Sequence, residues 1–242
     1  MTAVWAHRGS TAGGRENTLA AFWAARLGGA DGVELDVRSS ADGVLVVHHD
    51  AALDDGRFIA HTRAADLPGW LPSLEAALEE CGGLMVDVEV KNLPTEVGYD
   101  PEDGIGVATA RLVRRMGVGD GVVISAFAIS TIDAARATAP EIGTGWLTLA
   151  GYDQLDALAL AAERGHRALH PRHEAVTDEL VAAAHGRGMA VHTWTVDDVD
   201  RMRLMADAGV DAVITNVTDV AVAVLGRCDG HRRPGEDQRG DR

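Results

Sequence analysis

The sequence predicts an α/β protein with the (β/α)8 TIM-barrel fold in a single domain. Short runs rich in β-branched residues alternate with longer helical segments rich in Ala and Leu along almost the whole chain. Eight such strands over about 225 residues match the size of this barrel. An open, doubly wound sheet is the structural alternative, but no G-x-G-x-x-G follows the first strand, as its dinucleotide-binding form requires. The barrel is therefore the favoured fold.

The elements follow from these runs in order. The expected strands are Ala3–Ala6, Gly32–Arg38, Leu84–Lys91, Gly121–Ser125, Ile142–Leu147, Arg167–His170, Met189–Trp194 and Ala212–Thr215. The expected helices are Leu19–Leu27, Ser73–Glu80, Ile105–Met116, Ile129–Ala137, Gln154–Glu163, Thr177–Gly186 and Val199–Ala208. The stretches Asp50–Leu71 and Asn92–Gly104 interrupt this rhythm, and long connections in a compact domain are usually functional or mobile. The barrel should occupy residues 1–226, followed by a disordered tail of Gly, Pro and charged residues at 227–242.

Composition limits the partners. With 22 Lys and Arg against 37 Asp and Glu, the net charge is −15, and this field repels nucleic acid and anionic membranes. Cys81 and Cys228 lie too far apart in sequence to suggest a disulfide framework, which fits a reducing compartment. No leader pattern opens the chain, and no run approaches 18 apolar residues. We expect a cytoplasmic protein that binds no nucleic acid and forms no stable membrane association; the sequence makes no prediction of its oligomeric state.

Polar or aromatic residues end nearly every expected strand. In this barrel, catalytic groups project from the carboxyl ends of the strands, whereas the strand interiors here are mostly Val, Ile and Ala. In chain order these end residues are His7-Arg8-Gly9, Glu34 with Asp36, Glu89-Val90-Lys91, Ser125-Ala126-Phe127, Trp146, His170, Trp194 and Thr215-Asn216. The set as a whole predicts an active site more specifically than any one motif does.

Carboxylates gather on two of these strands. Glu34 and Asp36 are two residues apart, so their side chains share one face, and Asp87, Glu89 and Lys91 share a face in the same way. Three carboxylates that converge inside a barrel repel one another and lose hydration, and a divalent cation removes both problems. An all-oxygen set favours Mg²⁺ or Ca²⁺. The alternative is a set of salt bridges to Arg8, Arg38 and Lys91.

Two of the ten histidines are the best candidates for acid–base chemistry. His7 ends the first strand directly before Arg8, and His49 precedes Asp50, a carboxylate able to fix an imidazole tautomer. Two imidazoles beside a phosphate suit general acid–base catalysis near neutral pH. Seven others are expected to be structural or to lie at the surface: His48, His61, His166, His173, His185, His192 and His231.

Together these motifs resemble the glycerophosphodiester phosphodiesterase family. The resemblance spans about residues 4 to 217. Its motifs are His7-Arg8-Gly9, Glu16-Asn17-Thr18, Glu34-Leu35-Asp36-Val37, Asp42-Gly43, Val46-Val47-His48-His49-Asp50, Glu89-Val90-Lys91, Ser125-Ala126-Phe127, Trp194-Thr195-Val196, Gly209-Val210-Asp211 and Ile214-Thr215-Asn216. Two positions depart from the family: Arg15 stands where Pro is common, and Val217-Thr218 stands where Pro often follows.

The resemblance implies a TIM barrel that hydrolyses glycerophosphodiesters to sn-glycerol 3-phosphate and an alcohol. It implies one divalent cation, Mg²⁺ or Ca²⁺, held by Glu34, Asp36 and Glu89, and an acid–base pair formed by His7 and His49. The substrate-binding residues implied are Arg8 and Lys91 at the phosphate oxygens, Trp194 and Phe127 as an aromatic wall, and Glu16 on the loop after the first strand.

Other functions remain open at this point. A lysophospholipase D would run the same chemistry on a lipid, and the stretch 57–71 is apolar enough to receive an acyl chain. A phosphate-binding barrel without hydrolytic activity would need no pair of histidines. A phosphosugar isomerase on the same fold would need no three-carboxylate site.

Overall fold

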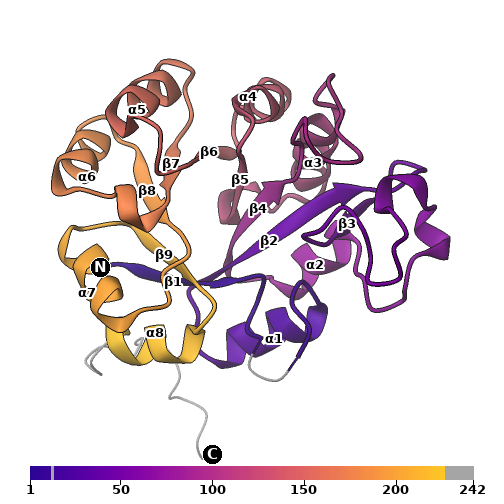
Figure 1. The fold of residues 1–242 in the computed structure, drawn as a ribbon, viewed down its shortest axis with the longest axis horizontal. Helices are drawn as coiled ribbons and strands as arrows, with labels where there is room; N and C mark the ends of the chain where they lie inside the picture. Colours follow the sequence, from indigo (N-terminus) through magenta and orange to yellow (C-terminus); the bar gives the residue numbers. More distant parts are fainter. Residues whose placement is uncertain (12–13, 227–242) are drawn as a thin grey trace, which may run out of the picture.

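Eight parallel strands close into a barrel in the computed structural model, which describes residues 1–11 and 14–226 (Figure 1). The predicted disordered tail, 227–242, with Cys228 and His231, lies outside the described residues. The barrel strands are β1 (Ala3–His7), β2 (Gly32–Ser39), β4 (Met85–Val90), β5 (Val122–Ala126), β6 (Gly143–Thr148), β7 (Ala168–Pro171), β8 (Ala190–Thr193) and β9 (Ala212–Thr215). The predicted fold class is confirmed.

The helices follow one another around the outside of this ring in chain order (Figure 1). They are α1 (Leu19–Leu27), α2 (Leu74–Glu80), α3 (Gly104–Met116), α4 (Ile129–Thr138), α5 (Gln154–Glu163), α6 (Asp178–His185), α7 (Val199–Asp207) and α8 (Thr218–Leu225). Thr18, Ser73, Thr177 and Asp198 each accept a hydrogen bond from the backbone N–H three residues on, which fixes where four of these helices begin. Among the described residues, none of the helices has the length and apolar run needed to cross a bilayer.

The barrel closes because β1 pairs on both sides. Trp5 of β1 lies opposite Gly32 of β2 and opposite Ile214 of β9. A further strand, β3 (Leu45–Val47), pairs antiparallel with the end of β2 and lies outside the ring, beside β2 in Figure 1. This short strand lies beside the carboxyl end of β2, and His49 follows it in the sequence.

The stretch between β3 and α2 forms a small unit with its own apolar cluster. It contains two single 3-10 turns, Ile59–His61 and Ala64–Asp66, and is otherwise irregular, as predicted. Its cluster is formed by Val46, Leu53, Ile59 and Leu71, with Leu67 and Trp70 packed against them. We call this unit, residues 50–71, the insert.

The two faces of the barrel strands differ in chemistry. On β4, Val86, Val88 and Val90 pack into the main hydrophobic core, while Asp87 and Glu89 between them point inward. Deeper inside the barrel, Asp87 Oδ2 lies 3.2 Å from His170 Nδ1. His170 Nε2 in turn lies 3.0 Å from His192 Nδ1. This layer of the barrel interior, directly below the mouth, is therefore polar.

Gly145 of β6 leaves the space that His170 fills. A Cβ at residue 145 would lie 2.3 Å from His170 Nε2, and His170 is completely buried, so it has no room to move away. We expect Gly145→Ala to lower the free energy of unfolding by about 1–3 kcal/mol. At Gly143 on the same strand, an added Cβ would make only ordinary contacts of 3.7 Å or more. Urea denaturation should therefore show a lower midpoint for Gly145→Ala but not for Gly143→Ala; equal midpoints would contradict this account.

Candidate functional site

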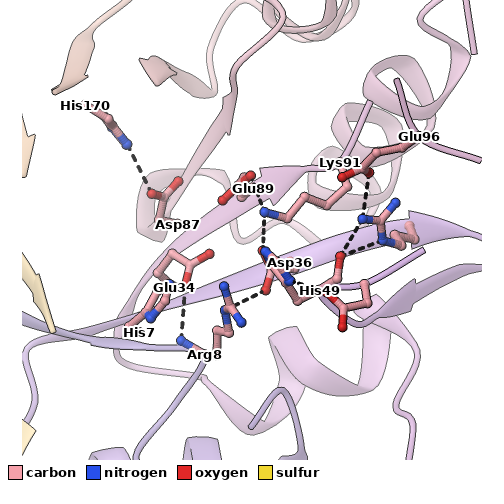
Figure 2. Close-up of polar contacts among 12 residues, drawn as sticks. His7, Arg8, Glu34, Asp36, His49, Asp87, Glu89, Lys91, Glu96 and His170 are labelled. Atoms are coloured by element: carbon pink, nitrogen blue, oxygen red, sulfur yellow. Dashed lines mark hydrogen bonds and ion pairs between the residues drawn. The ribbon is translucent and has the colours of Figure 1, made fainter. Parts of the chain in front are cut away.

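The carboxyl end of the barrel brings together most of the predicted site residues. Figure 2 shows side chains from the ends of β1, β2 and β4, with His49 from the segment after β3, gathered around one point. The residues that meet there are His7, Arg8, Glu34, Asp36, His49, Glu89 and Lys91. They come from neighbouring strands because β1, β2 and β4 are adjacent in the sheet.

Glu34, Asp36 and Glu89 form the acidic centre of the site. Each offers a carboxylate oxygen within 4.8 Å of those of the other two, and all three residues are buried. Among residues 1–11 and 14–226, none provides a hydrogen-bond partner for Glu34 Oε1, although this atom is buried. Burial raises the pKa of Glu34 well above its usual range, and the charges of Asp36 and Glu89 raise it further. An incompletely compensated all-oxygen group of this kind fits a hard divalent cation.

Two cations neutralise part of this charge. Lys91 Nζ lies 2.9 Å from Asp36 Oδ1 and also contacts Glu89, while Arg8 Nε lies 3.3 Å from Asp36 Oδ2. Burial alone would raise the pKa of Asp36, but Lys91 and Arg8 outweigh it and hold that pKa well below its usual range. Salt bridges, the alternative to a metal, thus compensate the charge of Asp36 and part of the charge of Glu89. They leave Glu34, to which no lysine or arginine side chain is paired among the described residues.

Arg38 takes no part in this neutralisation. Its guanidinium donates from Nε to the backbone oxygen of His49 at 2.7 Å and pairs with Glu96 at 2.8 Å. Arg38 therefore anchors the segment that carries His49, at the edge of the site.

His7 sits between the acidic centre and the last strand of the barrel. Its Nε2 lies 3.8 Å from Glu34 Oε2, and its Nδ1 lies 2.7 Å from Asn216 Oδ1. Burial lowers the pKa of His7; the bond to Asn216 opposes this shift, while the Arg8 charge adds to it. Burial therefore favours the neutral form of His7, which is able to accept a proton.

His49 has a charged partner instead. Its Nδ1 lies 2.7 Å from Asp50 Oδ1, the carboxylate next to it in the sequence. The imidazole is partly accessible, with about a third of its side chain exposed. A carboxylate at Nδ1 fixes the orientation of the ring.

The remaining predicted residues flank this centre. Phe127 and Trp194 contact each other edge to face with ring centroids 5.5 Å apart, and Trp194 Nε1 donates to the His170 backbone oxygen at 2.8 Å. Glu16 accepts from Arg8 Nη1 at 2.8 Å, so it holds Arg8 in place. Glu16 is thus connected to the acidic centre through Arg8.

Asn17 is a site residue to which the sequence motifs alone assigned no role. It is fully buried, donates from Nδ2 to Asp36 Oδ2 at 2.7 Å and accepts from the Asp36 backbone N–H at 3.3 Å. Its backbone is left-handed, with φ of 55°, a conformation that asparagine tolerates better than most residues. The motif Glu16-Asn17-Thr18 includes this asparagine, but it does not indicate the contact with Asp36.

Asp197 is the other such residue, and it lies in the loop after β8. It accepts hydrogen bonds from the Asn216 side chain and backbone. Because Asn216 in turn contacts His7, Asp197 is connected to the centre through one intermediate residue. Asp197 and Asn216 are both exposed at the barrel mouth.

Comparison with known proteins points to one family. Residues 7–220 match the model of the glycerophosphoryl diester phosphodiesterase family. A glycerophosphodiester phosphodiesterase from Caldanaerobacter subterraneus is 31% identical over 93% of this chain and 98% of that protein, and one from Bacillus altitudinis is 28% identical with the same coverage. The crystal structure of a putative glycerophosphoryl diester phosphodiesterase from Silicibacter pomeroyi has 27% identity and a TM-score of 0.82, covering 93% of each chain.

Proposed function

Because the chain belongs to the glycerophosphoryl diester phosphodiesterase family and hydrolyses glycerophosphodiesters, we propose that it does so at the barrel mouth with a divalent cation and two histidines. Glu34, Asp36 and Glu89 would hold the cation, Mg²⁺ or Ca²⁺, and His7 and His49 would form the acid–base pair. The products would be sn-glycerol 3-phosphate and an alcohol. The observation that carries the proposal is the buried acidic centre, with its unpartnered Glu34 oxygen, beside two imidazoles in different environments.

The side chains divide the work on the phosphodiester. Arg8 and Lys91 would bind the phosphate oxygens, since both already lie against Asp36 with their charges directed into the site. When bound, the cation would polarise the phosphoryl group and offset charge that develops in the transition state. His7, whose neutral form burial favours, would accept the proton of the attacking hydroxyl, and His49 would protonate the leaving alcohol.

The rest of the mouth would position the organic parts of the substrate. Trp194 and Phe127 present an aromatic edge-to-face pair at the ends of β8 and β5, suited to contact carbon-bound hydrogens of the glycerol unit. Glu16 would act through Arg8, whose guanidinium it holds by a hydrogen bond. The proposed binding partner at this site is a small-molecule glycerophosphodiester.

The insert favours a compact alcohol over a lipid tail. Its apolar residues Ile59, Leu67, Trp70 and Leu71 belong to the cluster that also contains Val46 of β3, and Phe58 is the large apolar side chain of the insert that is exposed. Arg15 adds to this packing, because its guanidinium lies 3.9 Å over the Trp70 ring and pairs with Asp54. Little apolar surface is left for an acyl chain, so a lysophospholipase D activity should be minor.

A substrate panel tests the proposed function. Glycerophosphocholine, glycerophosphoethanolamine and a lysophosphatidylcholine should be compared with and without added Mg²⁺ or Ca²⁺. We expect kcat/KM for the two glycerophosphodiesters to exceed that for the lysophospholipid. A preference for the lysophospholipid would shift the function to a lysophospholipase D, and binding of all three without turnover would indicate a phosphate-binding barrel.

We further expect the 2-hydroxyl of the glycerol unit to be the first nucleophile: its attack on phosphorus would expel the alcohol and form a cyclic phosphate, which water would open to sn-glycerol 3-phosphate in a second step. This hydroxyl is held close to phosphorus within the same molecule, and such intramolecular attack reaches effective molarities of roughly 10⁵ M or more. A 2-deoxy analogue should therefore bind comparably but turn over far more slowly, and phosphorus NMR on the normal substrate should show a transient cyclic phosphate. If the deoxy analogue has the same kcat, external water attacks directly.

A further inference from the structure

Three adjacent strand ends form a hydrogen-bond chain at the barrel mouth. Asp197 follows β8, Asn216 follows β9, and His7 ends β1. Asn216 Nδ2 donates to Asp197 Oδ2 at 2.8 Å, and Asn216 Oδ1 lies 2.7 Å from His7 Nδ1. The Asn216 backbone N–H and the Thr215 hydroxyl both donate to the other oxygen, Asp197 Oδ1, at 2.9 and 3.0 Å.

The chemistry of this chain gives every hydrogen bond one direction. An ionised carboxylate only accepts, so the Asn216 side chain must direct its NH2 group to Asp197 and its oxygen to His7. That oxygen in turn accepts only, so the proton of a neutral His7 must reside on Nδ1. Burial alone would raise the pKa of Asp197, but the hydrogen bonds from Asn216 and Thr215 lower it, and the carboxylate is ionised at neutral pH.

We propose that Asp197 is a positioning residue that, through Asn216, keeps His7 in the tautomer protonated at Nδ1, with the Nε2 lone pair free to accept a proton. The inference rests on the proposed role of His7 as the group that deprotonates the attacking hydroxyl. His7 Nε2 is the ring nitrogen that faces Glu34 and the acidic centre. A proton on Nε2 in the resting enzyme would leave no base at the reacting group.

The orientation of the Asn216 side-chain amide determines which nitrogen of His7 carries the proton. A side-chain amide presents an acceptor or a donor to His7 depending only on which way it is turned, and Asp197 decides the turn. His49 differs, because its Nδ1 meets the Asp50 carboxylate directly and no amide intervenes. A change at Asp197 should therefore alter His7 and leave His49 as it is.

The variant Asp197→Asn tests the direction of the chain. Its side-chain oxygen is expected to stay with the two donors from Thr215 and Asn216, which turns its NH2 group toward the Asn216 side chain. The Asn216 amide then turns over and donates to His7 Nδ1, so the proton of His7 moves to Nε2. We expect kcat to fall on the order of 10²-fold, while KM changes little because Asp197 does not contact the proposed phosphate-binding cations.

The exchanged pair, Asp197→Asn with Asn216→Asp, should reverse this loss. The new carboxylate accepts from His7 Nδ1, the new amide donates to that carboxylate, and His7 regains the original tautomer. Asp198→Asn is the matched control: Asp198 is the neighbouring carboxylate, it caps α7 by accepting from the Arg201 N–H, and asparagine caps equally well. The control should leave both tautomer and kcat unchanged.

Nitrogen NMR on the full chain labelled with ¹⁵N-histidine reads the tautomer without reference to activity. Spectra at about pH 8, where the imidazole is neutral, should show His7 protonated at Nδ1 in the native protein and at Nε2 in Asp197→Asn, with the signal assigned by its loss in His7→Gln. A native His7 protonated at Nε2, an unchanged tautomer in Asp197→Asn, or an inverted tautomer with unchanged kcat would each overturn the inference. Absence of turnover in the native protein would instead overturn the proposed function, because the spectrum still reports the tautomer.

Discussion

Removal of divalent cations is expected to abolish turnover, and addition of Mg²⁺ or Ca²⁺ is expected to restore it. The reason is the charge of the acidic centre, where three buried carboxylates face two cationic side chains. Within the described part of the chain, Glu34 keeps a buried oxygen without a partner, and burial raises the pKa of this carboxyl; a bound divalent cation would supply the positive charge that favours its ionised form. Initial rates on a glycerophosphodiester after exhaustive chelation, before and after each cation is added back, measure this dependence.

The substitution Glu89→Gln sharpens the test. It keeps the shape of the side chain but removes one charge from the centre, so cation affinity measured by calorimetry should fall. Loss of a residue that only supports a metal ligand weakens binding by roughly 10–100-fold, and loss of a ligand should weaken it at least as much. Glu96→Gln is the control, because Glu96 pairs with Arg38 outside the acidic centre. Full activity in cation-free enzyme would refute the metal proposal.

Replacing either histidine with alanine is expected to lower kcat on the order of 10²–10⁴-fold. The two losses have different physical origins. His7→Ala removes the proposed proton acceptor, a group whose pKa burial lowers, whereas His49→Ala removes the proposed proton donor, a ring that contacts the Asp50 carboxylate. Steady-state assays over a range of substrate concentrations separate these effects on kcat from effects on KM.

His61→Ala provides the control for loss of an imidazole. His61 lies on the surface of the insert, where its ring contacts Phe58 with centroids 5.7 Å apart. That variant should retain near-native kcat, and all three variants should unfold at denaturant concentrations close to that of the native protein. A histidine whose removal leaves kcat unchanged has no part in the reaction.

The barrel itself could be predicted because its strands obey simple patterns. Alternation of valine with acidic residues along β4 is enough to distinguish its inward face from its outward face. The predicted bounds agree with the structure at Leu19–Leu27, Gln154–Glu163 and Ala212–Thr215. Helix α8 was missed because Val220, Val222 and Val224 alternate with alanine, which has the period of a strand and not of a helix.

The sequence predicts those site residues that lie at the ends of strands, but it does not predict the contacts between distant positions. His7 and Asn216 are 209 positions apart, and their contact depends on the pairing of β1 with β9 that closes the barrel. No local pattern marks such a contact. Asn17 escaped for a related reason: its role depends on a left-handed backbone and on complete burial against Asp36, neither of which a sequence displays.

The antiparallel strand β3 leads from the closed barrel to an insert that has an apolar cluster of its own. His7 is built into the closed ring, but His49 follows an added strand, next to an insert whose small apolar cluster is separate from the main core. Local units with few buried contacts open at a smaller free energy than the whole domain does. We therefore expect the insert to open on heating while the barrel is still folded, which would displace His49, the second histidine of the proposed acid–base pair.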